Sequence, residues 1–155
     1  KKLKNMATLT VTVSESVVLQ GRNHGTTNTK TITGITGIFK RIMSISHSAA
    51  VAIYTCGTST ASAGSAFDSD EIEYVRLTNV GATTVDIKVV GTGNDTIWHQ
   101  LSAGASLLLF DHSASLEAHN ADVAHGARSL ADISSVSAIS NSSAGKLEVV
   151  IADSV

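Results

Sequence analysis

Three histidines alternate with three acidic residues between residues 111 and 125. The histidines are His112, His119 and His125, and the acidic residues are Asp111, Glu117 and Asp122. Imidazole and carboxylate groups bind zinc when they converge tetrahedrally, usually from short spacings on rigid elements. The separations here are longer, and neither His-x-His nor His-Glu-x-x-His occurs. We interpret the segment as a polar loop and predict no metal site, unless three-fold assembly brings copies of one histidine together.

Two other groups resemble reactive centres only superficially. Asp111, His112 and Ser113 are the residue types of a hydrolase triad, but neighbouring side chains diverge in an extended segment, so they cannot form the required chain of hydrogen bonds. Cys56 has no basic neighbour between residues 52 and 61 that would lower the pKa of its thiol, and we interpret it as a small buried hydrophobic residue. We predict no catalytic residues and no enzymatic activity.

Composition and motifs exclude several classes of ligand and partner. Gly91-Thr92-Gly93 lacks the third glycine and the following helix of a dinucleotide-binding loop, so we interpret it as a turn and predict no cofactor. The net charge is −2, and beyond the first four residues the basic side chains are scattered, so nucleic-acid binding is not expected. The longest apolar run, Leu107 to Phe110, is too short to span a bilayer. One cysteine cannot form an intrachain disulfide, which indicates folding in a reducing cytoplasm.

Three further residues are candidates for recognition. An exposed Trp98 would be able to stack on a sugar, but a lone tryptophan within a strand is more often part of the core, where we expect it. Tyr74 is the second candidate for an aromatic platform. Arg76 lies between Val75 and Leu77, and we expect it to have a structural role, with loop carbonyls or an acidic side chain as its partner.

Apolar residues alternate with polar ones along most of the chain. In TLTVTV, Leu9, Val11 and Val13 share one face; VDIKVV and KLEVVI repeat the pattern. This period of two predicts half-buried β-strands. Further strands are predicted at 16–20, 29–35, 39–45, 51–55, 71–78, 96–101, 106–110 and 136–140.

Turn-forming residues separate these strands. We predict turns at Asn79 to Gly81 and at Asn141 to Gly145. We expect Gly81 to adopt a positive φ, which glycine tolerates. We interpret Cys56 to Asp70 as a loop of small residues and Ala114 to His125 as an irregular loop. Leu130, Ile133 and Val136 recur at every third residue, which predicts a single helical turn. The pattern predicts an all-β fold, an antiparallel β-sandwich with at most one or two short helical turns. We expect one domain over residues 6–155, preceded by a five-residue extension.

The order of the segments resembles that of a known class of viral proteins. TLTVTVSESVVLQG leads to TKTITGITGIFKRIMSIS, then to EYVRLTNVGATTVDIKVV, LSAGASLLLF, LADISSVSAIS and KLEVVIAD. This order, which covers most of residues 6–153, resembles small β-sandwich virion proteins of tailed bacteriophages, especially podoviruses of marine or cyanobacterial hosts.

The resemblance implies a jelly-roll-like capsid decoration (cement) protein. Such a protein is trimeric, binds the major capsid protein on the outside of the head shell, stabilises that shell and is assembled in the host cytoplasm. This class of proteins has no catalytic residues that could be assigned to positions of this sequence. Related sandwiches occur in head fibres and tails, so the alternative is an adhesive or carbohydrate-binding module there.

Overall fold

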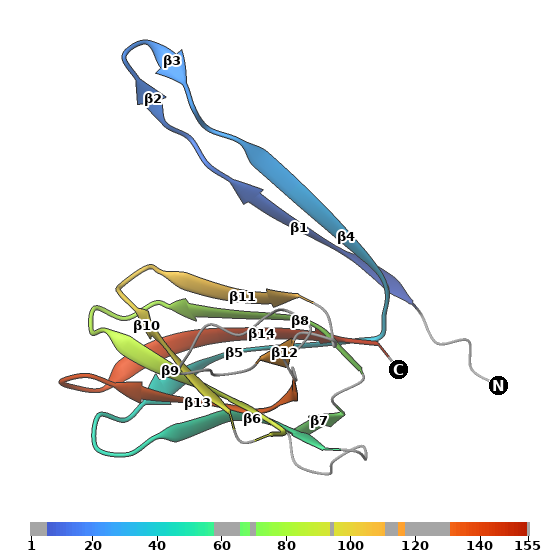
Figure 1. The fold of residues 1–155 in the computed structure, drawn as a ribbon, viewed down its shortest axis with the longest axis vertical. Coiled ribbons are helices and arrows are strands. Elements are labelled where there is room, and N and C mark those ends of the chain that lie inside the picture. The colour runs from blue at the N-terminus through green and yellow to red at the C-terminus, as the bar shows by residue number, and fades with distance from the viewer. Residues whose placement is uncertain are drawn as a thin grey trace, which may run out of the picture.

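The computed structural model describes residues 6–57, 66–68, 71–93, 95–110, 115–116 and 131–154. Within these ranges every regular element is a strand. The strands form a two-layered sandwich and a long hairpin arm that projects from it (Figure 1). The predicted all-β sandwich is therefore confirmed. The proposed extension of residues 1–5 lies outside the described residues.

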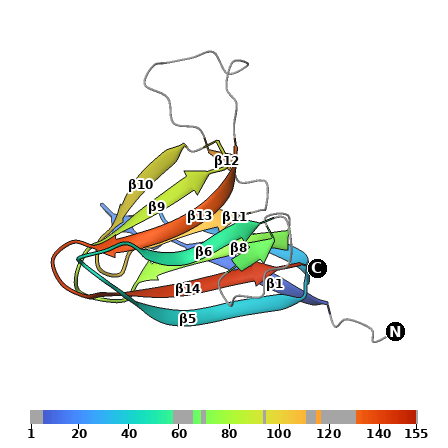
Figure 2. The ribbon, with the colours of Figure 1, turned by 90° about the horizontal axis from the view of Figure 1, so that it is seen from below.

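Two sheets form the sandwich (Figure 2). The first sheet has the order β10-β9-β13-β6-β7, and β12 pairs with β13 beside that path. Its strands are β6 (Val51–Gly57), β7 (Ala66–Asp68), β9 (Val85–Gly91), β10 (Thr96–Leu101), β12 (Ser115–Leu116) and β13 (Ala131–Ser140). The second sheet has the order β11-β8-β14-β5. Its strands are β5 (Gly37–Ile45), β8 (Ile72–Asn79), β11 (Ser106–Phe110) and β14 (Gly145–Asp153).

The strand order is that of a jelly roll. If β5, β6, β8, β9, β10, β11, β13 and β14 are numbered 1 to 8, the sheets read 5-4-7-2 and 6-3-8-1. Consecutive strands of this set cross between the sheets, except β9 and β10, which pair within the first sheet, and this is the pattern of two interlocked Greek keys. The ladders are antiparallel except for a short parallel pairing of β6 with β7.

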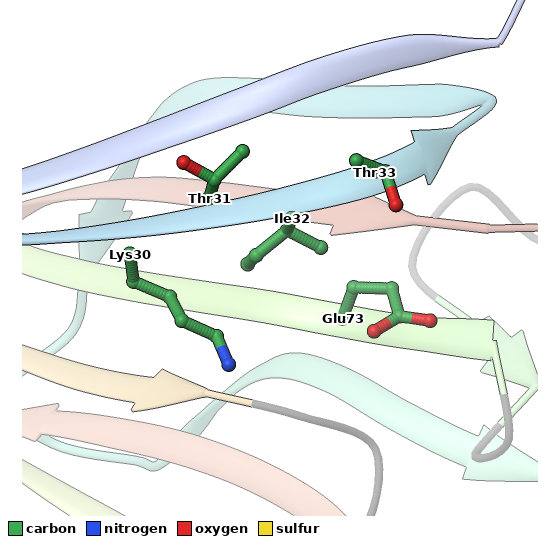
Figure 3. A pocket seen from close by; sticks show the side chains of 5 residues that line it. All are labelled: Lys30, Thr31, Ile32, Thr33 and Glu73. Carbon is green, nitrogen blue, oxygen red and sulfur yellow. The ribbon is translucent and has the colours of Figure 1, made fainter.

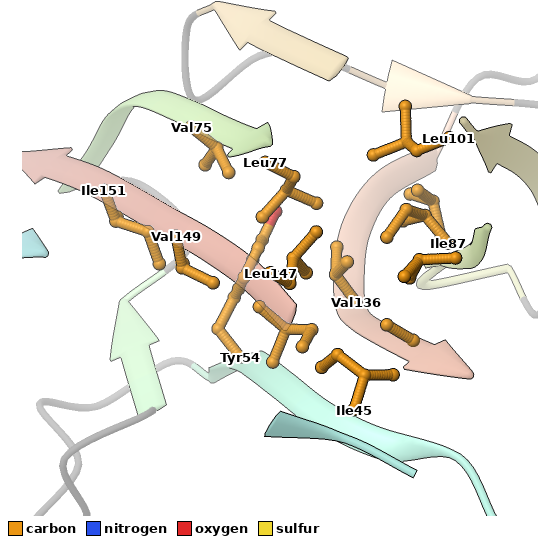
Figure 4. Packing of buried hydrophobic residues seen from close by; sticks show 14 of the residues in the cluster. Ile45, Tyr54, Val75, Leu77, Ile87, Leu101, Val136, Leu147, Val149 and Ile151 are labelled. Carbon is orange, nitrogen blue, oxygen red and sulfur yellow. The ribbon is translucent and has the colours of Figure 1, made fainter. Parts of the chain in front are cut away.

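The alternating apolar side chains meet between the two sheets (Figure 4). On β9 and β14 every second residue is buried, as the sequence predicts. These inward residues are Val85, Ile87, Val89, Leu147, Val149 and Ile151. Since the pleat has a period of two, a slip by one residue would turn each set toward water, and the core therefore fixes the register of the sheets.

Asn79 joins the end of β8 to the two strands that follow. Its side chain is fully buried, and its amide nitrogen donates to the carbonyls of Thr83, at 2.8 Å, and Leu101, at 2.9 Å. Its side-chain oxygen accepts from the N–H of Gly81 at 3.0 Å. Gly81 does not have the positive φ that we expected. A Cβ there would lie 3.0 Å from the backbone nitrogen of Lys146, so close packing favours glycine at this position.

The helical turn predicted around residues 130–136 is wrong for its described part, which is strand β13. The pairing of β13 with β9 shifts register between Ile133 and Ser135. Ser134 is the extra residue of this bulge, and its hydroxyl donates to the carbonyls of Val90, at 3.0 Å, and Gly91, at 3.3 Å. A β-bulge adds one residue to the period of two. Ile133 and Val136 therefore both pack on the core although they are three residues apart.

Two other predicted segments differ in part from the observed strands. The loop predicted from Cys56 to Asp70 contains strand β7, whose residues pair with Thr55, Cys56 and Gly57 of β6. The strand predicted at residues 16–20 shortens to β2 (Val18–Leu19), because Gln20 and Gly21 form a two-residue turn with φ values of 52° and 77°. Positive φ at both central residues is the geometry that closes a tight hairpin without splaying its strands.

Candidate functional site: an exposed hairpin arm

The arm is a two-stranded ribbon formed by residues 7–35. Its strands are β1 (Ala7–Ser14), β2 (Val18–Leu19), β3 (Arg22–Asn23) and β4 (Thr27–Ile35). β1 pairs with β4, and β2 pairs with β3 at the tip. Within the described residues neither ribbon strand pairs with a strand of the sandwich. The arm therefore presents unpaired backbone groups along both of its long edges, which is a common route for pairing with another chain.

The two faces of the arm have different chemistry. One face carries only hydroxyl-bearing residues, in four cross-strand pairs: Thr8–Thr33, Thr10–Thr31, Thr12–Thr29 and Ser14–Thr27. Two of these pairs share hydrogen bonds, at 3.3 Å between Thr12 and Thr29 and at 3.1 Å between Ser14 and Thr27. The opposite face carries the apolar set predicted from the sequence, Leu9, Val11 and Val13, whose partners on β4 are Ile32, Lys30 and Asn28.

The root of the arm packs on the outer face of the second sheet. Ile32 and Ile35 of the arm form a buried cluster with Tyr74 and Ala152 of the sheet. Partly buried residues pack around it: Leu9, Val11, Leu108 and Val150. Burial raises the pKa of the Tyr74 phenol, and the nearby Arg76 guanidinium opposes that shift. Tyr74 is thus part of this contact and is not an exposed platform.

Beyond this root the arm has no cover from the described residues, and its aliphatic side chains are exposed on both faces at the tip (Figure 1). Val18 is 69% exposed and Leu19 is 62% exposed, and Val13 and Val17 are also exposed. The tip nevertheless has a defined shape. The Asn23 side chain accepts from the N–H of Gly25 at 2.8 Å, and a Cβ on Gly25 would collide with the backbone oxygen of Glu15. The exposed aliphatic residues therefore lie on a shaped hairpin.

A groove of about 240 Å³ lies where the arm separates from the sandwich (Figure 3). It is lined by Lys30, Thr31, Ile32, Thr33 and Glu73. Glu73 accepts a hydrogen bond of 2.7 Å from the Ser154 hydroxyl. The lining carries two threonine hydroxyls, one ammonium group and one carboxylate. The groove is the space between β4 of the arm and β8 of the second sheet.

The acidic partner expected for Arg76 is Glu148, on the outer face of the same sheet. Arg76 also donates to the Thr78 hydroxyl at 3.0 Å, and the Lys40 ammonium lies 3.7 Å from Glu148. The charges of Arg76, Lys40 and Glu148 therefore have partners within this face of the sheet. Arg76 therefore has the structural role that we expected.

Cys56 is partly buried and packs against the core, as we expected for a small hydrophobic residue. Burial and, to a smaller extent, the carboxylate of Asp68 raise the pKa of its thiol to about 11. A cysteine nucleophile needs the opposite shift, because the thiolate is the reactive form.

The prediction that Trp98 lies in the core is wrong. Its side chain is 56% exposed. Within TIWHQL the inward positions are Ile97, His99 and Leu101, and of these only Leu101 is buried, because β10 is an edge strand of the first sheet. Trp98 occupies the outer face. Alternation with Ile97 and Leu101 puts Trp98 on the same face as the polar residues Thr96 and Gln100, and this is the signal that could have indicated its exposure.

Most of the remaining motifs lie outside the described residues. His112, His119 and His125, with Asp111, Ser113, Glu117 and Asp122, lie outside the residues that the structure describes. Gly91, at the end of β9, leads into a turn at Thr92 and Gly93, as predicted. In the described part of the chain, no group of three or more histidine, cysteine, aspartate or glutamate residues is placed to hold a metal ion. No described helix is long and apolar enough to cross a membrane.

The arm is the largest feature that sequence reasoning missed. Its strands were predicted, but not their separation from the sandwich. Comparison with family models, curated proteins and solved structures gives no match to this chain.

Proposed function

We propose that this protein is a non-enzymatic structural subunit of a bacteriophage virion. It is a trimeric decoration (cement) protein that binds the major capsid protein on the outside of the head shell. The observation that carries the proposal is the arm, whose distal half presents aliphatic side chains and unpaired strand edges to solvent. The phage identity rests on the resemblance in the order of segments.

The physical argument begins with the stability of the arm. An isolated two-stranded ribbon is marginally stable in water, and only the root of this one is held by a buried cluster. Val18 and Leu19 are consecutive on β2 and point to opposite faces of the ribbon, so a partner that surrounds the tip would bury both. Such docking also completes backbone hydrogen bonding if an edge of the ribbon adds to a strand of the partner.

The sandwich supplies a rigid base for this contact. A cement protein acts by binding across shell subunits, so its binding free energy is gained only in the assembled shell. Many copies on one shell act multivalently, and each interface is then sufficient at a modest size. The head is the proposed location, and the trimer provides three arms per bound unit.

The test measures occupancy on the shell. Purified protein is mixed with phage heads that lack it, and bound copies are located and counted in single-particle reconstructions. We expect density outside the shell with the arm in contact with the capsid protein. Val18→Asp and Leu19→Asp should lower occupancy at least tenfold, because burying an unpaired carboxylate is costly. Val80→Asp is the matched control, since Val80 is 47% exposed but lies on the sandwich.

Two results would contradict the proposal. The first is a protein that sediments as a monomer and is absent from particles of the phage that encodes it. The second is equal occupancy for the arm variants and the Val80 control, which would show that the arm does not make the contact.

A further inference from the structure

The outer face of the first sheet carries a mixed cluster around Trp98. Alternate residues of β10 face outward there, and each lies opposite an outward residue of β9. The pairs are Thr96–Val90, Trp98–Lys88 and Gln100–Asp86. Ser135 and Ser137 of β13 continue the rows beyond Val90 and Lys88. Three adjacent strands therefore present one indole ring among an amide, a carboxylate, an ammonium and hydroxyl groups.

The Trp98 ring contacts Lys88 but remains exposed to solvent. The Lys88 ammonium lies 5.8 Å from the ring centroid, at the outer range of a cation–π contact. The side chain still keeps 56% of its surface in solvent. An indole combines a large apolar area with few rotatable bonds, so stacking of a ligand on it costs little side-chain conformational entropy.

The polar neighbours keep hydrogen-bonding capacity for a ligand. The amide nitrogen of Gln100 donates to one Asp86 oxygen at 3.0 Å. This bond fixes both side chains, yet an amide has a second N–H and an acceptor oxygen, and a carboxylate has a second oxygen. The cluster thus offers donors and acceptors about one strand spacing, ~4.8 Å, and one pleat repeat, ~6.7 Å, from the indole.

The charges in the cluster select among ligands. Lys88 and Asp86 are one cation and one anion on the same strand and face, so the cluster has no net charge. Its polarity matches an uncharged molecule that both donates and accepts hydrogen bonds. Its apolar part is the indole ring, with Val90 and Ile139 at the ends of the neighbouring rows. A specific protein interface covers about 20–30 residues on each side, which is wider than this cluster.

We propose that this cluster, which we call the Trp98 platform, is a binding site for a neutral saccharide. One hexose ring stacks its apolar C–H face on the indole, on the side away from the Lys88 ammonium. Its hydroxyl groups exchange hydrogen bonds with Gln100 and Asp86, and neighbouring sugar units extend toward Ser137. The site is independent of the arm and does not depend on shell binding.

The chain allows a direct measurement, because Trp98 is its only tryptophan. Indole fluorescence of the full-length protein is titrated with neutral oligosaccharides of glucose, mannose, galactose and N-acetylglucosamine. We expect a saturable change in emission with at least one of them. The signal should be insensitive to salt up to about 0.5 M, since screening weakens only charge-dependent binding. Oligosaccharides of uronic acids serve as the charged comparison.

Variants locate the site by calorimetry with the same sugar. Trp98→Ala should weaken binding roughly tenfold or more, Trp98→Phe should restore part of it, and Gln100→Ala should weaken it severalfold. His99→Ala is the matched control, since His99 is exposed on the same strand but on the other side of it. Circular dichroism verifies that each variant is folded, and Gln100→Ala tests the site if Trp98→Ala does not fold.

Three outcomes would overturn the proposal. One is the absence of a saturable response to every neutral sugar at millimolar concentration. Another is unchanged affinity in Trp98→Ala or equal loss in His99→Ala. The third is preferential, salt-sensitive binding of the uronic acids, which would assign the surface to an anionic ligand. None of these results alters the test of arm binding to shells.

Discussion

The arm and the sandwich have similar sequence patterns but different burial. β1 alternates threonine with Leu9, Val11 and Val13 as regularly as β14 alternates its own residues. On β14 the inward set is fully buried, whereas Val13 on β1 is exposed. Only Ile32 and Ile35 among the buried hydrophobic residues belong to the arm. Alternation therefore indicates that a strand has an apolar face, but not whether its own chain covers that face.

The largest expected difference between the two regions is in hydrogen exchange. In the free protein, amides near the tip, between residues 17 and 24, should exchange through local opening, while those of β14 should exchange only on global unfolding. Since domains are stable by about 5–15 kcal/mol, protection should differ at least roughly a thousandfold. Exchange followed by mass spectrometry would measure this. Equal protection would mean that the arm is part of the same cooperative unit.

The next comparison is one substitution in two environments. Leu147→Ala removes a fully buried side chain from the core, and we expect a loss of about 2–5 kcal/mol in the free energy of unfolding. Leu19→Ala at the exposed tip of the arm should change it by less than about 0.5 kcal/mol. Urea midpoints of both variants provide the test. A similar loss for Leu19→Ala would show that the free protein buries the tip.

Asn79 and Asn28 allow the same comparison for a polar side chain. Asn79→Ala leaves the carbonyls of Thr83 and Leu101 and the N–H of Gly81 without their partner, and should cost about 1–3 kcal/mol. Asn28 is exposed on the arm, so Asn28→Ala should be nearly neutral. Thermal unfolding of both variants is the measurement. An unchanged melting temperature for Asn79→Ala would mean that water replaces the amide at no cost.

The smallest expected effect is an alkaline loss of stability confined to the sandwich. The pKa of Cys56 is raised to about 11, so the unfolded chain loses this proton at lower pH than the folded protein. The stabilisation is complete below pH ~9 and is lost as pH rises toward 11. Cys56→Ala should therefore flatten the dependence of the urea midpoint on pH in this range. A pH profile of Cys56→Ala parallel to that of the unsubstituted protein would indicate that burial does not shift the pKa of the thiol.

The fold could be predicted because its information is local and repeated. Strands 96–101 and 106–110 were predicted with the correct bounds, and the inward faces of β9 and β14 were predicted residue by residue. The structure also has the jelly-roll strand order that the resemblance implied. A period of two, with short turns between strands, leaves few other arrangements.

The errors arise where burial depends on distant segments. Trp98 is exposed because it lies on the outer face of the first sheet, and Tyr74 is buried because the root of the arm covers the outer face of the second. The spacing of Ile133 and Val136 resembled a helix because a bulge adds a residue to the strand. The bulge and the cover over Tyr74 leave no signal within a short window of sequence, whereas the alternation around Trp98 does.

The position of β14 has a consequence for biosynthesis. It lies between β8 and β5 in the second sheet, so until it has been translated β5 has no partner strand and β8 has only β11. The arm is translated before β8 and β14, the strands that support its root. Because β5 and β8 both wait for β14, the nascent chain exposes the apolar faces of these strands until β14 has been translated. Rapid synthesis therefore raises the risk that nascent chains aggregate before β14 emerges.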